Sequence, residues 1–476
     1  MSLAVSTGDN KTELPEQSSG PSKAAVRLVL ILVVSMIAPQ LDGTITNVAL
    51  KTLSGTFNSP LSSVQWVSTA YMLATAVMIP ITGWAAKRLG DKNLWLVACA
   101  LFLAGSIGAA MAWNLYSLIA WRVVQAAGGA VEATLMMVMV MKAAGGKNIA
   151  SLAATLSLPA LIVPIFGPLV GGAILTHLSW HWIFWINVPI SLAGLVLAAL
   201  YLPKDDGGHK HPFDAIGLAL AGVGTAALLY GISQAGSAGS FGAPQVVIPG
   251  LCGLALLAGF VAWTRHIINP AVDLKVFAVR SFSIATLALT FASFALYGAT
   301  LLLPLFWQTL RGATALAAGA ALIPQALGSL VTRTTAGKMT DRFGARWVVF
   351  IGAVITTGAT VPFIFMGADT SWIILAIVLF IRGLGLSGIV MPTIAASYFD
   401  MPKQQLDSAS IVSRVMQSVG NAFGAAVAAV LLEWGMSAGG MTATGAFHMA
   451  FIVVTVLTLA VAGLALCLKT ARKTAA

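Results

Sequence analysis

Fourteen apolar segments, each long enough to cross a lipid bilayer, run through this chain and are joined by short polar links. A bilayer span requires about 20 mostly apolar residues. Hydrocarbon offers the backbone no hydrogen-bond partners, so such segments must fold as helices. We therefore predict an all-α polytopic membrane protein. Its 14 transmembrane helices are expected at residues 26–49, 62–86, 94–112, 116–141, 149–176, 182–202, 214–233, 246–265, 282–308, 314–336, 347–367, 371–397, 406–433 and 446–468.

Composition and charge support this class of protein and orient it. Of the 476 residues, 58% are hydrophobic and 9% are charged, whereas about a quarter of the residues in a soluble domain are charged. Of the 26 Lys and Arg residues, 21 lie on the side of the N-terminus and two, Lys51 and Arg311, on the other side. The remaining three, Arg122, Arg382 and Arg414, lie within spans. Positive charge accumulates in cytoplasmic loops. Both termini are therefore expected in the cytoplasm, and the net charge of +11 reflects topology and not a nucleic-acid surface.

An internal repeat divides the chain into two halves. The loop after segment 62–86 has the same glycines and basic end as the loop after segment 314–336, which lies 254 residues later. Arg122 and Gly128 recur as Arg382 and Gly388, 260 residues later. We expect two pseudo-symmetric six-helix bundles, with the substrate between them near the midplane. The expected divisions are a disordered tail 1–25, a bundle 26–202, a two-helix insertion 203–281, a bundle 282–468 and a basic tail 469–476.

Two carboxyl groups lie inside expected spans. Asp42 ends the first apolar segment, and Glu132 lies in segment 116–141 together with Arg122. A charged side chain at the bilayer centre costs about 2.5–3.5 kcal/mol on insertion scales, and such residues usually mark an ion or substrate pathway. Arg122 and Glu132 are ten residues apart, about 15 Å along a helix, so they are not partners. We expect Asp42, Glu132 and Arg122 to carry proton or cation coupling.

The repeated loop resembles the signature loop of the major facilitator superfamily. The second copy matches in full, whereas Lys87 in the first copy occupies the usual aspartate position, and Asp91 is expected to cap the next helix. The resemblance implies two cytoplasmic gating loops. Their residues are Gly83, Lys87, Arg88, Gly90 and Asp91 in the first copy, and Gly337, Asp341, Arg342, Gly344 and Arg346 in the second.

Further stretches resemble the fourteen-helix drug/proton antiporters of that superfamily, the EmrB/QacA type. They are Leu41 to Ala49, Gln65-Trp66-Val67, Arg122 to Gly129 and Trp180 to Pro189. Segment 149–176 carries the antiporter motif of the drug exporters, formed by Pro164, Gly167, Pro168, Gly171 and Gly172.

The resemblance implies proton-coupled export of amphiphilic drugs, dyes or biocides by alternating access. A dedicated exporter of an endogenous metabolite or siderophore is the alternative, and a sensor or scaffold is disfavoured because no signalling domain is attached. An acidic cavity favours lipophilic cations, while Arg414 leaves neutral, zwitterionic or weakly acidic cargo open. Candidate cavity residues are Thr46, Asn47, Gln125, Gln308, Arg382 and Arg414.

The remaining expectations concern cofactors, partners and location. The three cysteines have no metal-ligand spacing, and the chain shows no nucleophile elbow or phosphate loop. We therefore expect no enzyme activity, metal or cofactor, with transport driven by the proton gradient. The resemblance implies a bacterial cytoplasmic (inner) membrane location. A periplasmic adaptor and an outer-membrane channel are candidate partners.

Overall fold

The computed structural model describes residues 23–468, except for residues 60, 65, 145–166, 168–169, 204–213, 268–269, 271, 314 and 437–439. Within this range it does not place every side chain, and that of Asn47 is among those outside the description. The described elements are all helical, as expected. Twelve of the described helices are long and apolar enough to cross a membrane.

The first half is a bundle around α1, whose 34 residues include Pro39 and Asp42. Its short α2 and α8 lie at one end, and the expected segment 149–176 falls largely outside the described residues. The described helices are α1 (Lys23–Thr56), α2 (Leu61–Val64), α3 (Trp66–Leu89), α4 (Asp91–Ala110), α5 (Leu115–Ala144), α8 (Trp182–Trp185) and α9 (Asn187–Tyr201).

The second half contains a break that the hydropathy pattern did not predict. The expected helix 314–336 is two helices, because the chain turns at residues 321–322, and the longer one runs on to Phe343. This longer helix, α14, is less apolar than the others and is not among the twelve candidate spans. The helices are α12 (Arg280–Arg311), α13 (Ala315–Ala320), α14 (Ile323–Phe343), α15 (Ala345–Thr360), α16 (Trp372–Tyr398), α17 (Leu406–Met436) and α18 (Ala443–Leu466), with 3-10 turns η1 (Leu274–Ala278), η2 (Val361–Ile364) and η3 (Lys403–Gln405).

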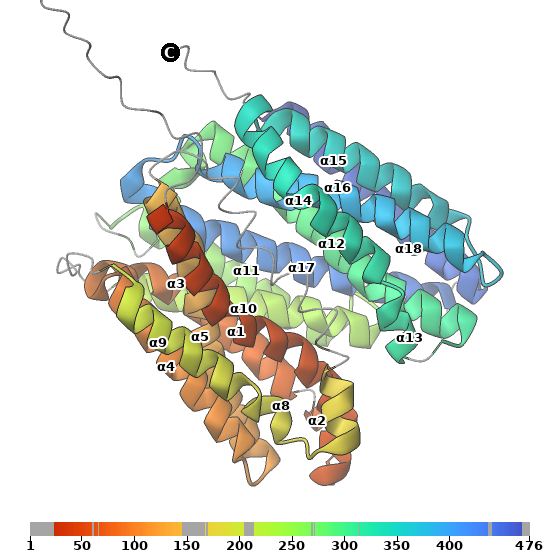
Figure 1. Ribbon diagram of the computed structural model, residues 1–476, viewed down its shortest axis with the longest axis horizontal. Coiled ribbons are helices and arrows are strands. Elements are labelled where there is room, and N and C mark those ends of the chain that lie inside the picture. The colour runs from red at the N-terminus through yellow and green to blue at the C-terminus, as the bar shows by residue number, and fades with distance from the viewer. Residues whose placement is uncertain are drawn as a thin grey trace, which may run out of the picture.

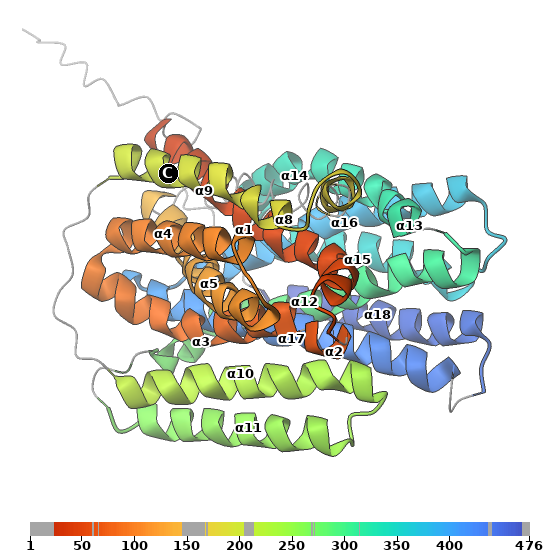
Figure 2. The same cartoon turned by 90° about the horizontal axis from the view of Figure 1, so that it is seen from below.

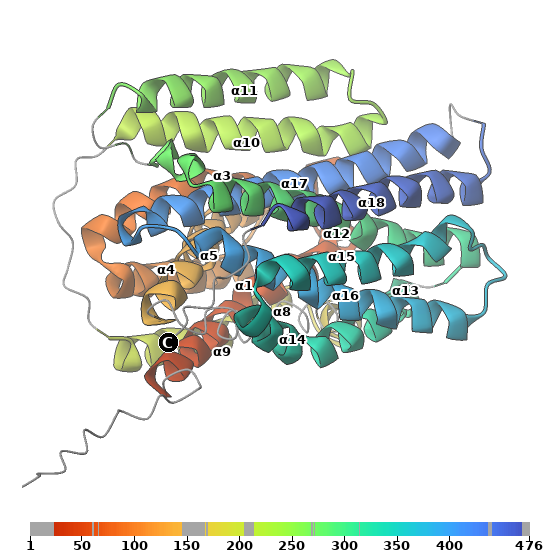
Figure 3. The ribbon, with the colours of Figure 1, turned by 90° about the horizontal axis from the view of Figure 1, so that it is seen from above.

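The two halves form separate groups of helices (Figure 1). Between them in sequence come α10 (Ala215–Ala238) and α11 (Pro244–Thr264). This pair lies side by side on the outside of the molecule, where α10 packs against α3 of the first half and α17 of the second (Figures 2 and 3). The insertion therefore touches both halves.

Contacts between the halves concentrate at one end of the bundle. We call the end where α1 begins and α18 ends the basal end, and the opposite end the distal end. One apolar cluster joins Ile79 and Met141 of the first half to Tyr398, Leu406 and Ile411 of the second at the basal end. Two of the described apolar clusters at the distal end each belong to a single half, and a third joins α10 and α11 to α17.

The repeat is visible in the backbone of the two basal loops. Gly90 has φ 81° and ψ 158°, and Gly344 has φ 83° and ψ 157°. An L-residue with a side chain rarely adopts this positive φ, so both positions favour glycine. The 254-residue offset therefore corresponds to a real structural repeat.

Candidate functional site

Asp42 lies in α1 with its side chain fully buried. Its Oδ2 atom forms an ion pair with Nη1 of Arg122. Its Oδ1 atom accepts hydrogen bonds from Nε2 of Gln125 at 3.1 Å and from Nδ2 of Asn187 at 3.0 Å. Three donors from α5 and α9 thus converge on two oxygens, an arrangement that fits a charged carboxylate.

Arg122 is held by groups on several helices. Its Nη1 atom also donates to Oε1 of Gln125 at 2.6 Å, and its Nε atom donates to the carbonyl oxygen of Val67 at 3.3 Å. The guanidinium lies 4.2 Å from the centre of the Tyr71 ring, a favourable cation–π distance. Arg122 is 1% exposed, so this charge is compensated entirely within the first half.

Close packing of α4 on α5 positions Gln125. A side chain at Gly105 would collide with the backbone of Gln125, with 2.5 Å between the added Cβ and the amide nitrogen. The Nε2 atom of Gln125 also donates to Oγ of Ser106 at 2.9 Å. Glycine at position 105 therefore allows α4 to approach closely enough for Ser106 to orient the amide of Gln125.

Asn187 is the member of this site that sequence reasoning missed. It is the first residue of α9 and is fully buried. The only signal was its place in the stretch Trp180 to Pro189, which was quoted for the family resemblance and not for chemistry. We refer to Asp42, Arg122, Gln125 and Asn187 below as the Asp42 network.

Glu132 lies outside this network. It is ten residues beyond Arg122 on α5, is 1% exposed, and its Oε2 atom has no hydrogen-bond partner among the described residues. The thiol of Cys99 on α4 lies near its carboxyl group. Glu132 therefore has fewer described polar partners than Asp42 and no described cation beside it.

The second half buries a comparable arginine. Arg382 of α16 is 1% exposed. It donates from Nε to Oγ1 of Thr360 at 3.2 Å and from Nη1 to Oε1 of Gln325 at 2.5 Å. Both partners are neutral. We call these three residues the Arg382 site.

The other candidate cavity residues are dispersed. Thr46 is buried and donates to the carbonyl oxygen of Asp42 one turn earlier, while Gln308 is exposed near the distal end of α12. Arg414 is partly buried on α17 and acts electrostatically on Tyr71 of the first half. Arg414 thus faces the boundary between the halves.

The antiporter motif is described only in part, because Pro164 and Pro168 lie outside the described residues. A side chain at Gly167 would collide with Thr44, and one at Gly171 would lie 3.4 Å from Ile45, whereas Gly172 faces open space. Both contacts are on α1 beside Asp42. The small residues of the motif therefore permit close packing against the helix that carries the buried carboxylate.

The basal loops bring charges of the two halves together. Gly90, not Asp91, occupies the N-cap of α4. Asp91 follows it in the first turn, and its carboxylate pairs with Nζ of Lys142 at 2.7 Å. Asp407 of α17 lies 4.0 Å from the same Nζ atom, and Lys87 also acts electrostatically on it. Lys142 therefore connects an acid of each half.

Apolar and backbone contacts lie next to this charge cluster. Oγ of Ser410 donates to the carbonyl oxygen of Thr134 at 2.9 Å, and Gly83 packs against the side chain of Ile411.

In the second copy of the loop, Gly337, Asp341 and Arg342 lie at the end of α14. Gly344 separates this helix from Arg346 at the start of α15.

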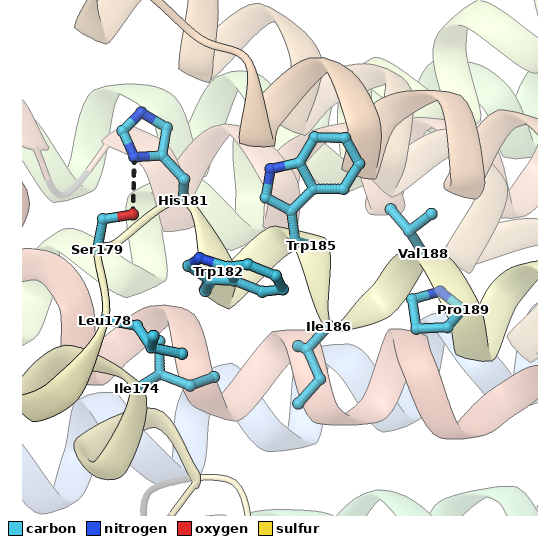
Figure 4. Close-up of a pocket in the computed structure, with 9 residues that line it drawn as sticks. All are labelled: Ile174, Leu178, Ser179, His181, Trp182, Trp185, Ile186, Val188 and Pro189. Atoms are coloured by element: carbon cyan, nitrogen blue, oxygen red, sulfur yellow. Dashed lines mark hydrogen bonds between the residues drawn. The ribbon is translucent and has the colours of Figure 1, made fainter.

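A cavity of about 590 Å³ opens at the distal end of the first half. None of the candidate site residues lines it. Ile186 and Val188 flank Asn187 in sequence and both belong to its wall, but Asn187 itself donates to Asp42 instead. The lining, shown in Figure 4, is Ile174, Leu178, Ser179, His181, Trp182, Trp185, Ile186, Val188 and Pro189.

Within the described ranges, no cluster of three or more His, Cys, Asp or Glu residues is arranged to hold a metal ion. The described charges are instead buried on helices. An ion pair, neutral donors and an isolated carboxyl group can hold or exchange a proton, and they can respond to a charged ligand.

Comparison with known proteins identifies the family. The model of the Major Facilitator Superfamily matches residues 32–333 and 285–476. The Multidrug resistance protein B homolog of Mycobacterium tuberculosis is 34% identical over 425 residues, which cover 88% of this chain and 78% of that protein. The Multidrug export protein EmrB of Escherichia coli K12 is 28% identical over 423 residues, covering 86% and 81%.

A solved structure is similar in fold. The human organic anion transporter MFSD10 (TETRAN) superimposes with a TM-score of 0.65 at 13% sequence identity, over 91% of this chain and 99% of that one. At this identity the likeness concerns the fold alone. Taken together with the sequence matches, it places the chain in the major facilitator superfamily, among the EmrB-type drug transporters.

Proposed function

We propose that this protein is a proton-coupled antiporter that exports amphiphilic drugs, dyes or biocides by alternating access. The observation that carries the proposal is the Asp42 network, a buried carboxylate held by Arg122, Gln125 and Asn187 inside a membrane bundle. Buried charges of this kind in spanning helices mark ion pathways. The relatives named as multidrug export proteins support the class of cargo.

In this proposal, Asp42 is the coupling acid. A proton on Asp42 neutralises the carboxylate and removes the charge that holds Arg122. Because Arg122 also contacts Val67 and Tyr71 of α3, its release alters the packing of α1, α3, α5 and α9 together. Cargo that enters between the halves competes with this protonated state, so export and proton entry are exchanged.

Glu132 is the second proton site in the proposal. Its isolation from any described cation favours the neutral acid, and charging it inside the bundle is unfavourable. Arg122, the partner of Asp42, and Glu132 lie ten residues apart on α5, about 15 Å along its axis, so the two acids are at different depths. A proton moving through the first half can therefore use both acids in turn.

Alternating access is supported by the distribution of contacts. The described contacts between the halves lie at the basal end, where Lys142, Asp407, Ser410 and Ile411 meet. We infer that this conformation is closed at the basal end. In the proposal, residues 26–202 and 282–468 move as two units, and the insertion 203–281 stays packed beside them. Rocking of two such halves around a central site is the usual motion of such transporters.

The same proposal places the protein in its cell. We propose the bacterial cytoplasmic membrane, with the basal end and both termini in the cytoplasm, because positive charge accumulates at that end. The proton gradient is the energy source, with no cofactor and no enzymatic step. A periplasmic adaptor and an outer-membrane channel are proposed partners for carrying cargo beyond the distal end.

Transport into proteoliposomes tests the proposal. An imposed proton gradient should drive ethidium against its own concentration gradient in the wild-type protein. Asp42→Asn should abolish this coupled movement, and Glu132→Gln should reduce it. Asp369→Asn, which alters an exposed acid in a distal loop, should leave it unchanged. Normal coupled transport by both Asp42→Asn and Glu132→Gln would show that the proton assignment is wrong.

A further inference from the structure

The second half contains a buried cation that the proposed export mechanism does not use. Arg382 is 1% exposed, and its two described partners, Gln325 and Thr360, are both neutral. A guanidinium remains charged under all ordinary conditions. A buried charge requires a counter-charge or water, and the described part of the second half provides no carboxylate beside this one.

The position of Arg382 along α16 accounts for this. It lies ten residues after the start of the helix and sixteen before its end, about 15 Å and 24 Å along the axis. The described acids of the second half lie instead at helix ends or in loops. They are Asp341, Asp369, Asp400, Asp407 and Glu433.

The internal repeat shows what is missing. The 254-residue offset pairs Tyr71 with Gln325 and Ser106 with Thr360, and the 260-residue offset pairs Arg122 with Arg382. The second half therefore keeps the arginine, and it has polar side chains at the positions that match Tyr71 and Ser106. The two offsets place the position that corresponds to Asp42 between Leu296 and Leu302 of α12. This stretch contains no carboxylate, so the negative member of the first network has no equivalent.

The site retains unused donors. A guanidinium has five N–H groups, and those of Arg382 make two described hydrogen bonds. Gln325 uses its Oε1 atom as the acceptor, which leaves its amide N–H groups as further donors. Gln325 is only partly buried on α14, so the site is not fully enclosed on that side.

Tight packing fixes these donors in place. A side chain at Gly383 would collide with the carbonyl oxygen of Gln325, and one at Gly328 would collide with that of Phe380. Ser329 also donates to the carbonyl oxygen of Gly383 at 2.9 Å. The α14–α16 contact therefore holds Gln325 against Arg382 before any ligand arrives.

We propose that the Arg382 site binds a small monovalent anion, a halide or a carboxylate group. The anion supplies the negative charge that Asp42 supplies in the first half. Two sources offer this chemistry: an inorganic ion from solution or the acidic head of an amphiphile. The binding does not depend on the proposed proton coupling at Asp42.

Thermal unfolding of the purified full-length protein in detergent tests this site. The midpoint is measured in sodium methanesulfonate, whose anion is neither a halide nor a carboxylate, and then with increasing chloride, or with increasing benzoate, at constant ionic strength. Ligand binding to the folded state raises the midpoint, and above the dissociation constant the rise grows with the logarithm of the ligand concentration. We expect an increase of at least about 2 °C at about 100 times the dissociation constant. A response to chloride identifies the inorganic ion, and a response to benzoate alone identifies the acidic head of an amphiphile.

Two variants separate binding from general stability. Arg382→Gln should lose the dependence on the anion. Gln325→Glu places a carboxylate next to the same Nη1 atom, so it should also lose the dependence while unfolding in methanesulfonate at or above the wild-type midpoint. Arg311→Gln changes an arginine of the same half that donates to backbone carbonyls, and it should keep the full anion response.

Because the readout is the anion-dependent difference, a lower absolute midpoint in Arg382→Gln does not obscure the result. The proposal is overturned by a wild-type midpoint that is the same in methanesulfonate, chloride and benzoate. It is also overturned by an undiminished anion response in Gln325→Glu. Neither measurement requires transport, so failure here is distinct from failure of the export mechanism.

Discussion

The two halves bury the same residue type at matched positions and compensate it in different ways. Arg122 pairs with the carboxylate of Asp42, whereas Arg382 contacts only the neutral side chains of Gln325 and Thr360 among the described residues. The first half therefore compensates its buried arginine with an internal carboxylate, whereas the second half has no described counter-charge for its own. A proton can neutralise the carboxylate of an internal pair, while an arginine without a counter-charge can bind an anion from solution.

The first half should be far more sensitive to loss of its arginine. Arg122→Gln leaves Asp42 buried without a cation, which costs about 3–5 kcal/mol. We expect coupled ethidium transport to fall at least about 100-fold, measured as initial rates in proteoliposomes. Arg382→Gln removes an uncompensated charge and should reduce the rate less than about 10-fold. Equal losses in the two variants would remove the contrast between the halves.

The Asp42 network should behave as a single unit. If Asp42 and Arg122 act through each other, the double variant Asp42→Asn/Arg122→Gln should be no less stable than Arg122→Gln alone. Chemical or thermal unfolding of the two single variants and the double variant measures this coupling. Additive losses would mean that the two residues contribute independently.

Packing at Gly105 should matter for the same network. Gly105→Val forces α4 away from the backbone of Gln125, and overpacking of this kind typically costs about 1–3 kcal/mol. We expect a lower unfolding midpoint together with impaired transport. Gly358→Val is the matched control in the second half, because an added side chain there meets open space, and it should retain both properties.

Asn187 should have a smaller effect than Arg122. Asn187→Ala removes one neutral donor from a carboxylate that keeps two others, and a hydrogen bond to a charged group contributes about 1.5–3 kcal/mol. The expected loss of coupled transport is about 10-fold or somewhat more. A wild-type rate would mean that the contact of Asn187 with Asp42 is structural only.

The basal charge cluster should have the smallest effect. Lys142 is largely exposed, and a pair of this kind contributes about 0.2–1 kcal/mol. Lys142→Gln should shift the population closed at the basal end by only about two- to five-fold, measured by distances between spin labels on α5 and α17. Lys92→Gln provides the control, because Lys92 donates to carbonyl oxygens within the first half. An equal shift in both variants would mean that Lys142 has no specific role between the halves.

Much of the fold follows from hydropathy and charge, because lipid allows few alternatives to helices. The repeat was visible because Gly90 and Gly344 require the same unusual backbone geometry. The break between α13 and α14 was not predicted, since a turn within an apolar stretch leaves no hydropathy signal. The length of α14 was also underestimated, because it continues through the polar residues Lys338 to Arg342.

The candidate site was predictable where charges were involved. A buried acid requires a partner, so Asp42 directed attention to Arg122. Asn187 gave no such signal, because it is neutral and lies 145 residues from Asp42 in the chain. The partners of Arg382 were missed for the same reason. The contact between Lys142 and Asp407 involves segments whose proximity only the folded chain reveals.

The helix pair α10 and α11 has a mechanical consequence. α10 packs against α3 and α17, and the rings of Trp66 and Tyr230 stack on one side while those of Phe241 and Phe423 stack on the other. Since α3 and α17 belong to different halves, a relative rotation of the halves must displace α10 against α3, against α17, or against both. The insertion therefore resists relative rotation of the halves. If the contact of α10 with one half breaks first, the insertion moves together with the other half.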